Sequence, residues 1–316
     1  MTTRSVASLV FLLGVVGCGP DSYQLILETE HGIRIEPHAH GPTDADPPHS
    51  EWFFRETTVP EDLVVTGYEI QVHNAPLNIL HHMALFRRDE HYFLCESFGN
   101  FEELITIAQN RATEKIEFAP PYGVVLLEGT PLSMEVMTHH ADQPYGVGGV
   151  FDGVHFSVVL DVEPLARSDR DRSVVFFRLH LDDTPCEVPA RHQAFAVPPQ
   201  VEHFVRSGRG TSGEGPQAFV FPADGTILKM GANLWGGKGG EREIALINGE
   251  PVHEFVPEIM EPTDPWSWKI PIWQDANLRV DAGDTLTLEA IYSNPHEDPI
   301  LDATGQLLVF FAPDET

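Results

Sequence analysis

The feature that most limits the fold is a succession of short runs rich in Val, Ile, Phe and Thr, which Pro and Gly interrupt about every ten residues. Short strands at this spacing are typical of antiparallel β-sandwiches. A chain of 316 residues is long enough for two domains, and its 42% hydrophobic content can build a core in each. The sequence therefore predicts an all-β protein with two tandem antiparallel β-sandwich domains of jelly-roll type.

The runs predict strands in both halves of the chain. In the first half they cover residues 63–73, 79–86, 124–127, 132–137, 153–162 and 173–180. In the second half they cover residues 217–222, 226–232, 243–247, 266–272, 285–292 and 307–311. Only residues 101–112 show helical spacing, which predicts a short peripheral helix. Residues 185–199 concentrate Pro, Cys and small side chains, as expected of a junction between domains.

The charge of the chain excludes one class of partner. It has 48 acidic and 19 basic residues, a formal charge of −29 at pH 7. Such a surface repels phosphate backbones and anionic lipid head groups, so nucleic acid is not an expected partner. An exported protein with a solvated carboxylate surface is the simplest reading of this composition.

The N-terminus has the pattern of an export signal. Arg4 precedes an apolar run at residues 6–16, which is too short to span a bilayer. Val15-Val16-Gly17-Cys18 resembles a bacterial lipobox, in which Cys18 would be lipidated and become the mature N-terminus. We therefore expect a lipoprotein at the outer membrane, in the periplasm or on the cell surface, touching the membrane only through Cys18. A plain secretory signal is the alternative.

Export changes the interpretation of the other cysteines. If lipid modifies Cys18, an even pair remains, Cys95 and Cys186, in an oxidising compartment. A disulfide between them is one expectation, and two separate buried thiols are the other. Residues 19–50 have no apolar periodicity and predict a flexible tether. Within that tether His38 and His40, with His49 nearby, could bind metal loosely or simply be solvated.

Paired histidines inside apolar strands are the main functional signal. His81-His82 lies within the run at residues 77–86, and His139-His140 ends the run that begins at Met134. Neighbouring side chains of a regular strand point to opposite faces, so neither pair is ordinary core. A bulge, or coordination through different ring nitrogens, could bring both rings of a pair onto one metal ion. In the structural alternative the pairs are incidental.

These residues carry a resemblance to a known family. Val65 to Ile70, then His81-His82-Met83 with Leu85-Phe86, then the strand into His139-His140 together resemble the first domain of the copper type II, ascorbate-dependent monooxygenases. That family includes peptidylglycine α-hydroxylating monooxygenase and dopamine β-monooxygenase. The resemblance covers residues 51–312 and implies one copper ion bound by His81, His82 and His139. His140 would replace the family's Tyr.

The resemblance breaks in the second half of the chain. The family binds its oxygen-activating copper there, through a His-x-His pair and a Met. Alignment places Ala232 and Leu234 at the histidine positions and Ala303 at the methionine position. Alkyl side chains supply no lone pair, so these replacements would remove that copper rather than tune it.

The combined prediction is a copper-binding lipoprotein that stores, senses or delivers copper, or passes electrons. Its expected partner is a small-molecule reductant or a redox partner protein. Its parts would be a signal peptide at 1–18, a tether at 19–50, a copper-binding domain at 51–192 and a second sandwich at 193–316. An active copper monooxygenase remains open, as does a zinc hydrolase on the same three histidines with Glu135 as the base. A metal-free β-sandwich binding module is the remaining alternative.

Overall fold

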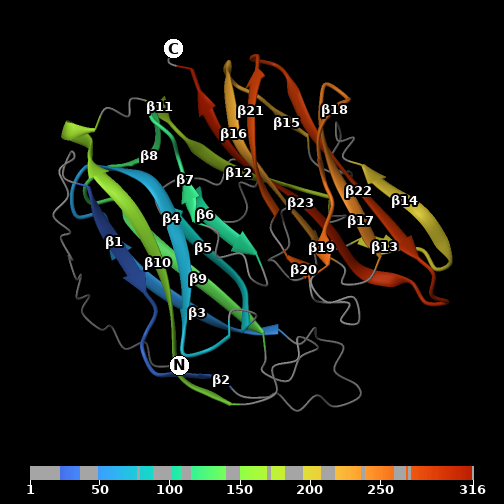
Figure 1. Ribbon diagram of the computed structural model, residues 1–316, viewed down its shortest axis with the longest axis horizontal. Helices are drawn as coiled ribbons and strands as arrows, with labels where there is room; N and C mark the ends of the chain where they lie inside the picture. Colours follow the sequence, from blue (N-terminus) through green and yellow to red (C-terminus); the bar gives the residue numbers. More distant parts are fainter. Residues whose placement is uncertain are drawn as a thin grey trace.

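The computed structural model describes most of the chain. The described residues are 22–35, 49–76, 79–87, 102–108, 115–139, 150–168, 172–181, 195–207, 218–235, 239–259, 268–269 and 272–314. For a few strand residues, among them His49, His81, His82 and His139, the description covers the backbone alone. Strands dominate, and they form two sandwiches that lie next to each other (Figure 1). The predicted all-β class with two tandem, mainly antiparallel sandwiches is confirmed.

The first sandwich consists of two facing sheets. The larger has the order β1-β10-β4-β8-β11, with β2 on β10 and β7 on β4. Its strands are β1 (Tyr23–Glu28), β2 (Ile33–Ile35), β4 (Leu63–His73), β7 (Ile116–Glu117), β8 (Tyr122–Leu126), β10 (Phe151–Pro164) and β11 (Arg172–Ser173). The smaller has the order β3-β9-β5-β6, formed by β3 (His49–Thr58), β9 (Pro131–His139), β5 (Leu80–Arg87) and β6 (Glu102–Ala108). A short 3-10 helix at Leu165–Arg167 follows β10.

The second sandwich has the same plan. One sheet has the order β12-β23-β16-β21 with β13 on β23, and the other has the order β14-β22-β17-β18 with β15 on β22. The first comprises β12 (Val175–His180), β13 (Phe195–Val197), β16 (Gly225–Trp235), β21 (Ile272–Val280) and β23 (Ile300–Pro313). The second comprises β14 (Val201–Ser207), β15 (Phe219–Val220), β17 (Gly240–Ile247), β18 (Glu250–Phe255) and β22 (Thr285–Asn294). A separate ribbon pairs β19 (Glu258–Ile259) with β20 (Trp268–Lys269).

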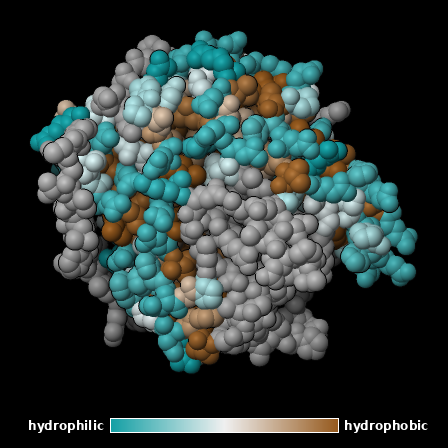
Figure 2. Space-filling view, viewed as in Figure 1, coloured by the Kyte–Doolittle hydropathy of each residue, from teal (hydrophilic) through white to brown (hydrophobic). Residues whose placement is uncertain are grey.

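Alternation along the strands builds the two cores. On β22, Leu286, Leu288, Ala290 and Tyr292 are all fully buried, as expected where every second side chain of a strand faces one core. The large exposed hydrophobic side chains among the described residues are dispersed: Leu127, Val150, Val205, Val220 and Val256. Figure 2 shows hydrophilic side chains over much of the described part of one face. Among the described residues, no helix is both long and apolar enough to cross a membrane.

A second layer of packing joins the sandwiches. Leu308, Phe310 and Ala312 of β23 are buried together with the core of the first sandwich, whereas Leu307, Val309 and Phe311 are buried in the second. The alternation of β23 therefore gives one face of the strand to each core. Phe310 lies at the centre of this junction, with its ring against Tyr68, Phe118, Phe176 and Trp273.

Two sequence-based expectations are wrong. The predicted tether contains β1 and β2: residues 23–28 pair antiparallel with β10, and Leu25 and Leu27 are buried in the first core. The helix predicted at residues 101–112 is replaced by β6, which pairs with β5. In both cases long-range pairing on a sheet edge decides the conformation, and a short segment seen alone carries little sign of it.

The domain boundary also lies earlier than predicted. β12, at Val175–His180, pairs along its length with β23 of the second sandwich. β11, at Arg172–Ser173, still pairs with β8 of the first. The chain thus passes between sandwiches near Val174, rather than at residues 192–193. Composition favoured the Pro-rich segment at 185–199, but the pairing of β12 is set by its partner strand.

Candidate metal centre

The predicted copper ligands come from adjacent strands of the smaller sheet. β9 lies between β5 and β3. On one side, Leu80 lies opposite Thr138 and His82 lies opposite Met137, so His81 is an extra residue on β5. This irregularity has the form of a β-bulge, in which two residues of one strand oppose one residue of the next. The bulge proposed from the sequence is therefore present in the backbone at His81.

The other edge of β9 brings a further histidine that sequence reasoning assigned to the tether. His49 opens β3 and lies directly opposite His139. The register shifts again immediately afterwards, because Trp52 pairs with Met137. The end of β9 is thus flanked by irregular pairing on both sides. The sequence grouped His49 with His38 and His40, and only the position of β3 on this sheet places it opposite His139.

Strand geometry limits how far apart these backbone positions can be. Directly opposite residues in an antiparallel pair have Cα atoms about 4.5–5.5 Å apart, and diagonal neighbours lie roughly 7–8 Å apart. His49 and His139 are opposite, and His82 and His139 are diagonal neighbours. The sheet therefore gathers His49, His81, His82 and His139 at one end. Their side chains, and His38, His40, His140, Cys18, Cys95 and Cys186 entirely, lie outside the described residues.

The three positions aligned with the family's second copper behave as core. Ala232, Leu234 and Ala303 are all buried within the second sandwich. Packing against neighbouring alkyl groups explains their residue types. Among the described residues of the second sandwich, no three His, Cys, Asp or Glu side chains lie close enough together to hold a metal ion.

A second histidine group lies on the larger sheet. His155 of β10 is paired in register with His73 of β4. The rings of His73 and His31 both stack on that of His155, each with a centroid distance of 4.1 Å. Glu28, at the end of β1, contacts His31 with Oε2 3.1 Å from Nε2. No sequence motif links these residues, because they meet only through strand pairing.

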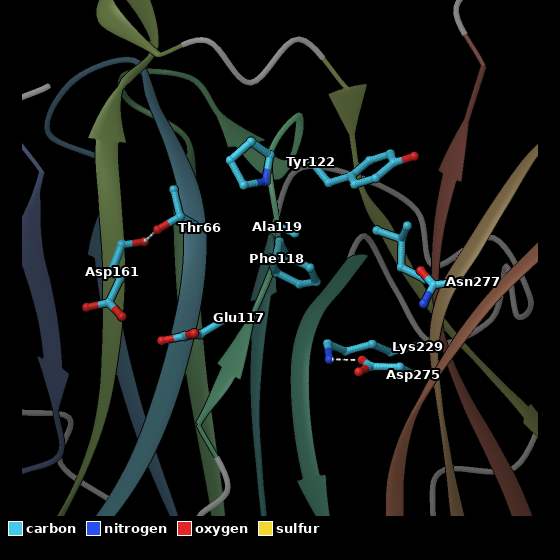
Figure 3. Close-up of a pocket in the computed structure, with 11 residues that line it drawn as sticks. Thr66, Glu117, Phe118, Ala119, Tyr122, Asp161, Lys229, Asp275 and Asn277 are labelled. Carbon is cyan, nitrogen blue, oxygen red and sulfur yellow. Dashed lines mark hydrogen bonds and ion pairs between the residues drawn. The ribbon is translucent and has the colours of Figure 1, made fainter. Parts of the chain in front are cut away.

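A cleft of about 640 Å³ lies between the two sandwiches, beside their packed junction (Figure 3). Thr66, Glu117 and Asp161 approach it from the first sandwich, and Lys229 and Asp275 from the second. Phe118, Ala119, Pro120, Tyr122, Leu228 and Asn277 complete the lining.

Each charged side chain that lines this cleft has an ion-pair partner. Lys115 Nζ lies 2.8 Å from Glu117 and 2.9 Å from Asp161, and hydrogen bonds to these carboxylates raise the pKa of Lys115. Lys229 is paired with Asp275 across β16 and β21. Carboxylates held by lysines are poor general bases, so this cleft is a weak candidate for a catalytic site. The histidine groups are the stronger candidates for a functional site.

One further constellation contains the residue types of a hydrolase. His203 Nδ1 lies 2.7 Å from Glu241 Oε2, and the Ser293 hydroxyl donates to the other oxygen of Glu241. These hydrogen bonds, with that of Ser293 the larger cause, lower the pKa of Glu241. A catalytic triad needs the imidazole between serine and carboxylate, whereas here the carboxylate lies between the other two. This arrangement ties β14 to β17 and β22 and does not activate the serine.

Comparisons with known proteins find only distant structural likenesses. No family model and no curated protein matches the chain. Among solved structures, the major capsid protein P2 of bacteriophage PM2 is 7% identical, with a TM-score of 0.38, 93% of this chain covered and 98% of that one. PNGF-II is 11% identical at a TM-score of 0.46, covering 93% of this chain and 66% of that one. Peptide: N-glycanase F is 9% identical at 0.45, with 93% and 96% covered.

Proposed function

We propose that this protein is an exported copper-binding protein in which His81, His82 and His139 bind one copper ion. The observation that supports the proposal is the bulge at His81, which lies next to the end of β9 where His139 is found. A bulge interrupts the strict alternation of faces, so consecutive histidines need not diverge to opposite sides of the sheet. His49, opposite His139, is a fourth candidate ligand.

The donor set suits copper. Neutral imidazole is a favoured ligand of copper and zinc, and three imidazoles without thiolate or carboxylate can serve both Cu(I) and Cu(II). A copper ion bound there would supply one-electron redox chemistry. The role of the chain would be to hold three histidines on rigid strands of one sheet, with β9 supported on both edges.

Copper handling or electron transfer fits the molecule better than oxygenation. In the copper monooxygenase family that this chain resembles, a second copper ion is bound in the second domain. The aligned positions here are the buried alkyl side chains Ala232, Leu234 and Ala303. We therefore propose that the partner of this protein is a reductant or a redox protein, and that this chain does not hydroxylate a substrate. The proposal also includes anchoring through a lipidated Cys18, as the N-terminal pattern predicts.

The first test is copper content. We expect the purified, copper-loaded chain to bind one copper ion at this centre, and His82→Ala or His139→Ala to lower the copper content by about one ion per chain. His203→Ala is the matched control, because His203 is exposed and lies in the second sandwich. Equal copper content in His82→Ala, His139→Ala and wild type would refute the site. Two copper ions per chain in the wild type would instead favour an active monooxygenase.

The second test is redox behaviour. We expect ascorbate to abolish the Cu(II) electron paramagnetic resonance signal of the loaded protein, leaving a persistent reduced form. Oxygen uptake coupled to a hydroxylated product is not expected, since in the described part of the second sandwich no three His, Cys, Asp or Glu side chains lie close enough to hold a metal ion. Stoichiometric formation of a hydroxylated product would show that this chain is an enzyme.

A further inference from the structure

The histidine group on the larger sheet has the chemistry of a metal site that is separate from the proposed copper centre. Glu28, His31 and His155 each offer one ligand atom, and these atoms lie within 4.8 Å of one another. Two imidazoles and a carboxylate form a donor set that zinc and other divalent first-row ions accept, with positions left for water. Each residue comes from a different part of the fold: the end of β1, the turn before β2, and β10.

The packing around His155 positions its ring. The imidazoles of His31 and His73 are stacked on it at interplanar angles of 12° and 7°. Parallel rings at the same short distance require His155 to lie between the other two. His73 is itself held by Ser157, whose Oγ lies 2.9 Å from His73 Nε2. The His73 ring therefore keeps His155 in place from one side, whereas His31 must leave the stack to direct its in-plane lone pair at the same ion.

His155 also has unused bonding capacity. Its Nδ1 is buried and has no hydrogen-bond partner. A buried polar atom without a partner costs free energy unless a ligand, an ion or water meets it. Burial, followed by the neighbouring His73 and His31, lowers the pKa of His155, while Glu28 and the Gly153 backbone oppose this shift.

Little movement is needed to close the site. Metal–ligand bonds to imidazole or carboxylate are about 2.0–2.2 Å long, so two ligand atoms on one ion lie at most about 4.4 Å apart. His31 lies three residues after the end of β1 and directly before Gly32, whose φ is +86°. Its side chain is 65% exposed. A rotation of this side chain can bring its ring nitrogen closer to Glu28 and His155 without disturbing the core.

We propose that Glu28, His31 and His155 form a divalent metal site that clamps the N-terminal edge strand β1 to β10. Zn²⁺ is the expected type of ion, with His73 as a positioning residue that supports the ring of His155. Among the described strands β1 lies at the edge of this sheet and pairs with β10 alone, so a metal bond across their ends would reduce its fraying. The site does not depend on copper binding by His81, His82 and His139.

The test is zinc binding by the full chain, read by hydrogen–deuterium exchange. We expect Zn²⁺ alone to slow exchange of the β1 amides at residues 23–28, and to raise the melting temperature as binding to the native state requires. His31→Ala and Glu28→Gln should weaken this zinc binding more than about tenfold, since even loss of a supporting residue outside the ligand shell costs about 10–100-fold. Both side chains are partly exposed, so the variants should fold.

Matched variants keep the result decisive. His203→Ala, in the other sandwich, should leave the zinc effect on β1 unchanged, and so should His82→Ala if the two sites are independent. His73→Ala should weaken zinc binding less than His31→Ala does. The proposal is overturned if zinc leaves β1 exchange unchanged in wild type, or if His31→Ala and Glu28→Gln respond to zinc as wild type does.

Discussion

Replacing Phe310 by alanine is expected to lower the free energy of unfolding by about 3–5 kcal/mol, the usual cost of deleting a buried aromatic ring. Phe310 is fully buried, and its ring contacts Tyr68, Phe118, Phe176 and Trp273. Because these partners come from both sandwiches, the resulting cavity would lie at their junction. Equilibrium unfolding in urea, with the slope of the transition compared between variants, measures the effect.

Two variants control this measurement. Phe310→Leu keeps much of the buried volume and should lose markedly less stability than Phe310→Ala. Val256→Ala removes an exposed side chain, 61% accessible, and should change the free energy of unfolding by less than about 0.5 kcal/mol. A loss below about 1 kcal/mol in Phe310→Ala would show that the two sandwiches do not depend on this contact.

The second large effect is expected at Glu243, an acidic residue in the core of the second sandwich. Its side chain is fully buried on β17, and neither carboxyl oxygen has a hydrogen-bond partner. Burial raises the pKa of Glu243 well above its usual value of 4.5, and the Gln306 backbone opposes this only in part. The folded protein therefore keeps this carboxyl protonated at a pH where the unfolded chain has lost the proton.

The direction of the pH dependence follows from proton linkage. Below about pH 4.5 both states carry the proton, so Glu243 contributes no slope to the stability curve. Above that pH the folded state binds more protons than the unfolded state, and the free energy of unfolding falls as pH rises toward the folded pKa. Glu243→Gln removes this contribution. The stability of the variant relative to wild type should therefore rise as the pH increases above about 4.5.

The measurement compares urea unfolding of wild type and Glu243→Gln from pH 4 to pH 9, because other titrating groups cancel in the difference. Glu250→Gln is the matched control, since Glu250 is exposed on the neighbouring strand β18. Its curve should remain parallel to that of wild type. Parallel curves for Glu243→Gln would mean that Glu243 is not buried as a neutral acid.

Much of the strand content could be predicted because alternation is a local property. Residues 63–73 were predicted as a strand, and β4 has those same bounds. The paired histidines at 81–82 and 139–140 were likewise visible, since two imidazoles in an apolar run conflict with ordinary packing. By contrast, residues 23–28 and 102–108 are strands through pairing with β10 and β5, and their own residues did not identify them.

Local patterning could specify which segments extend and which side chains conflict with a core, since each depends on near neighbours along the chain. It could not specify which histidines meet. His31, His73 and His155 approach one another because β10 pairs with β4 and β1, and His49 faces His139 because β3 pairs with β9. Register between distant strands is set by the burial of whole sheets, so the tertiary structure alone decided the composition of both histidine groups.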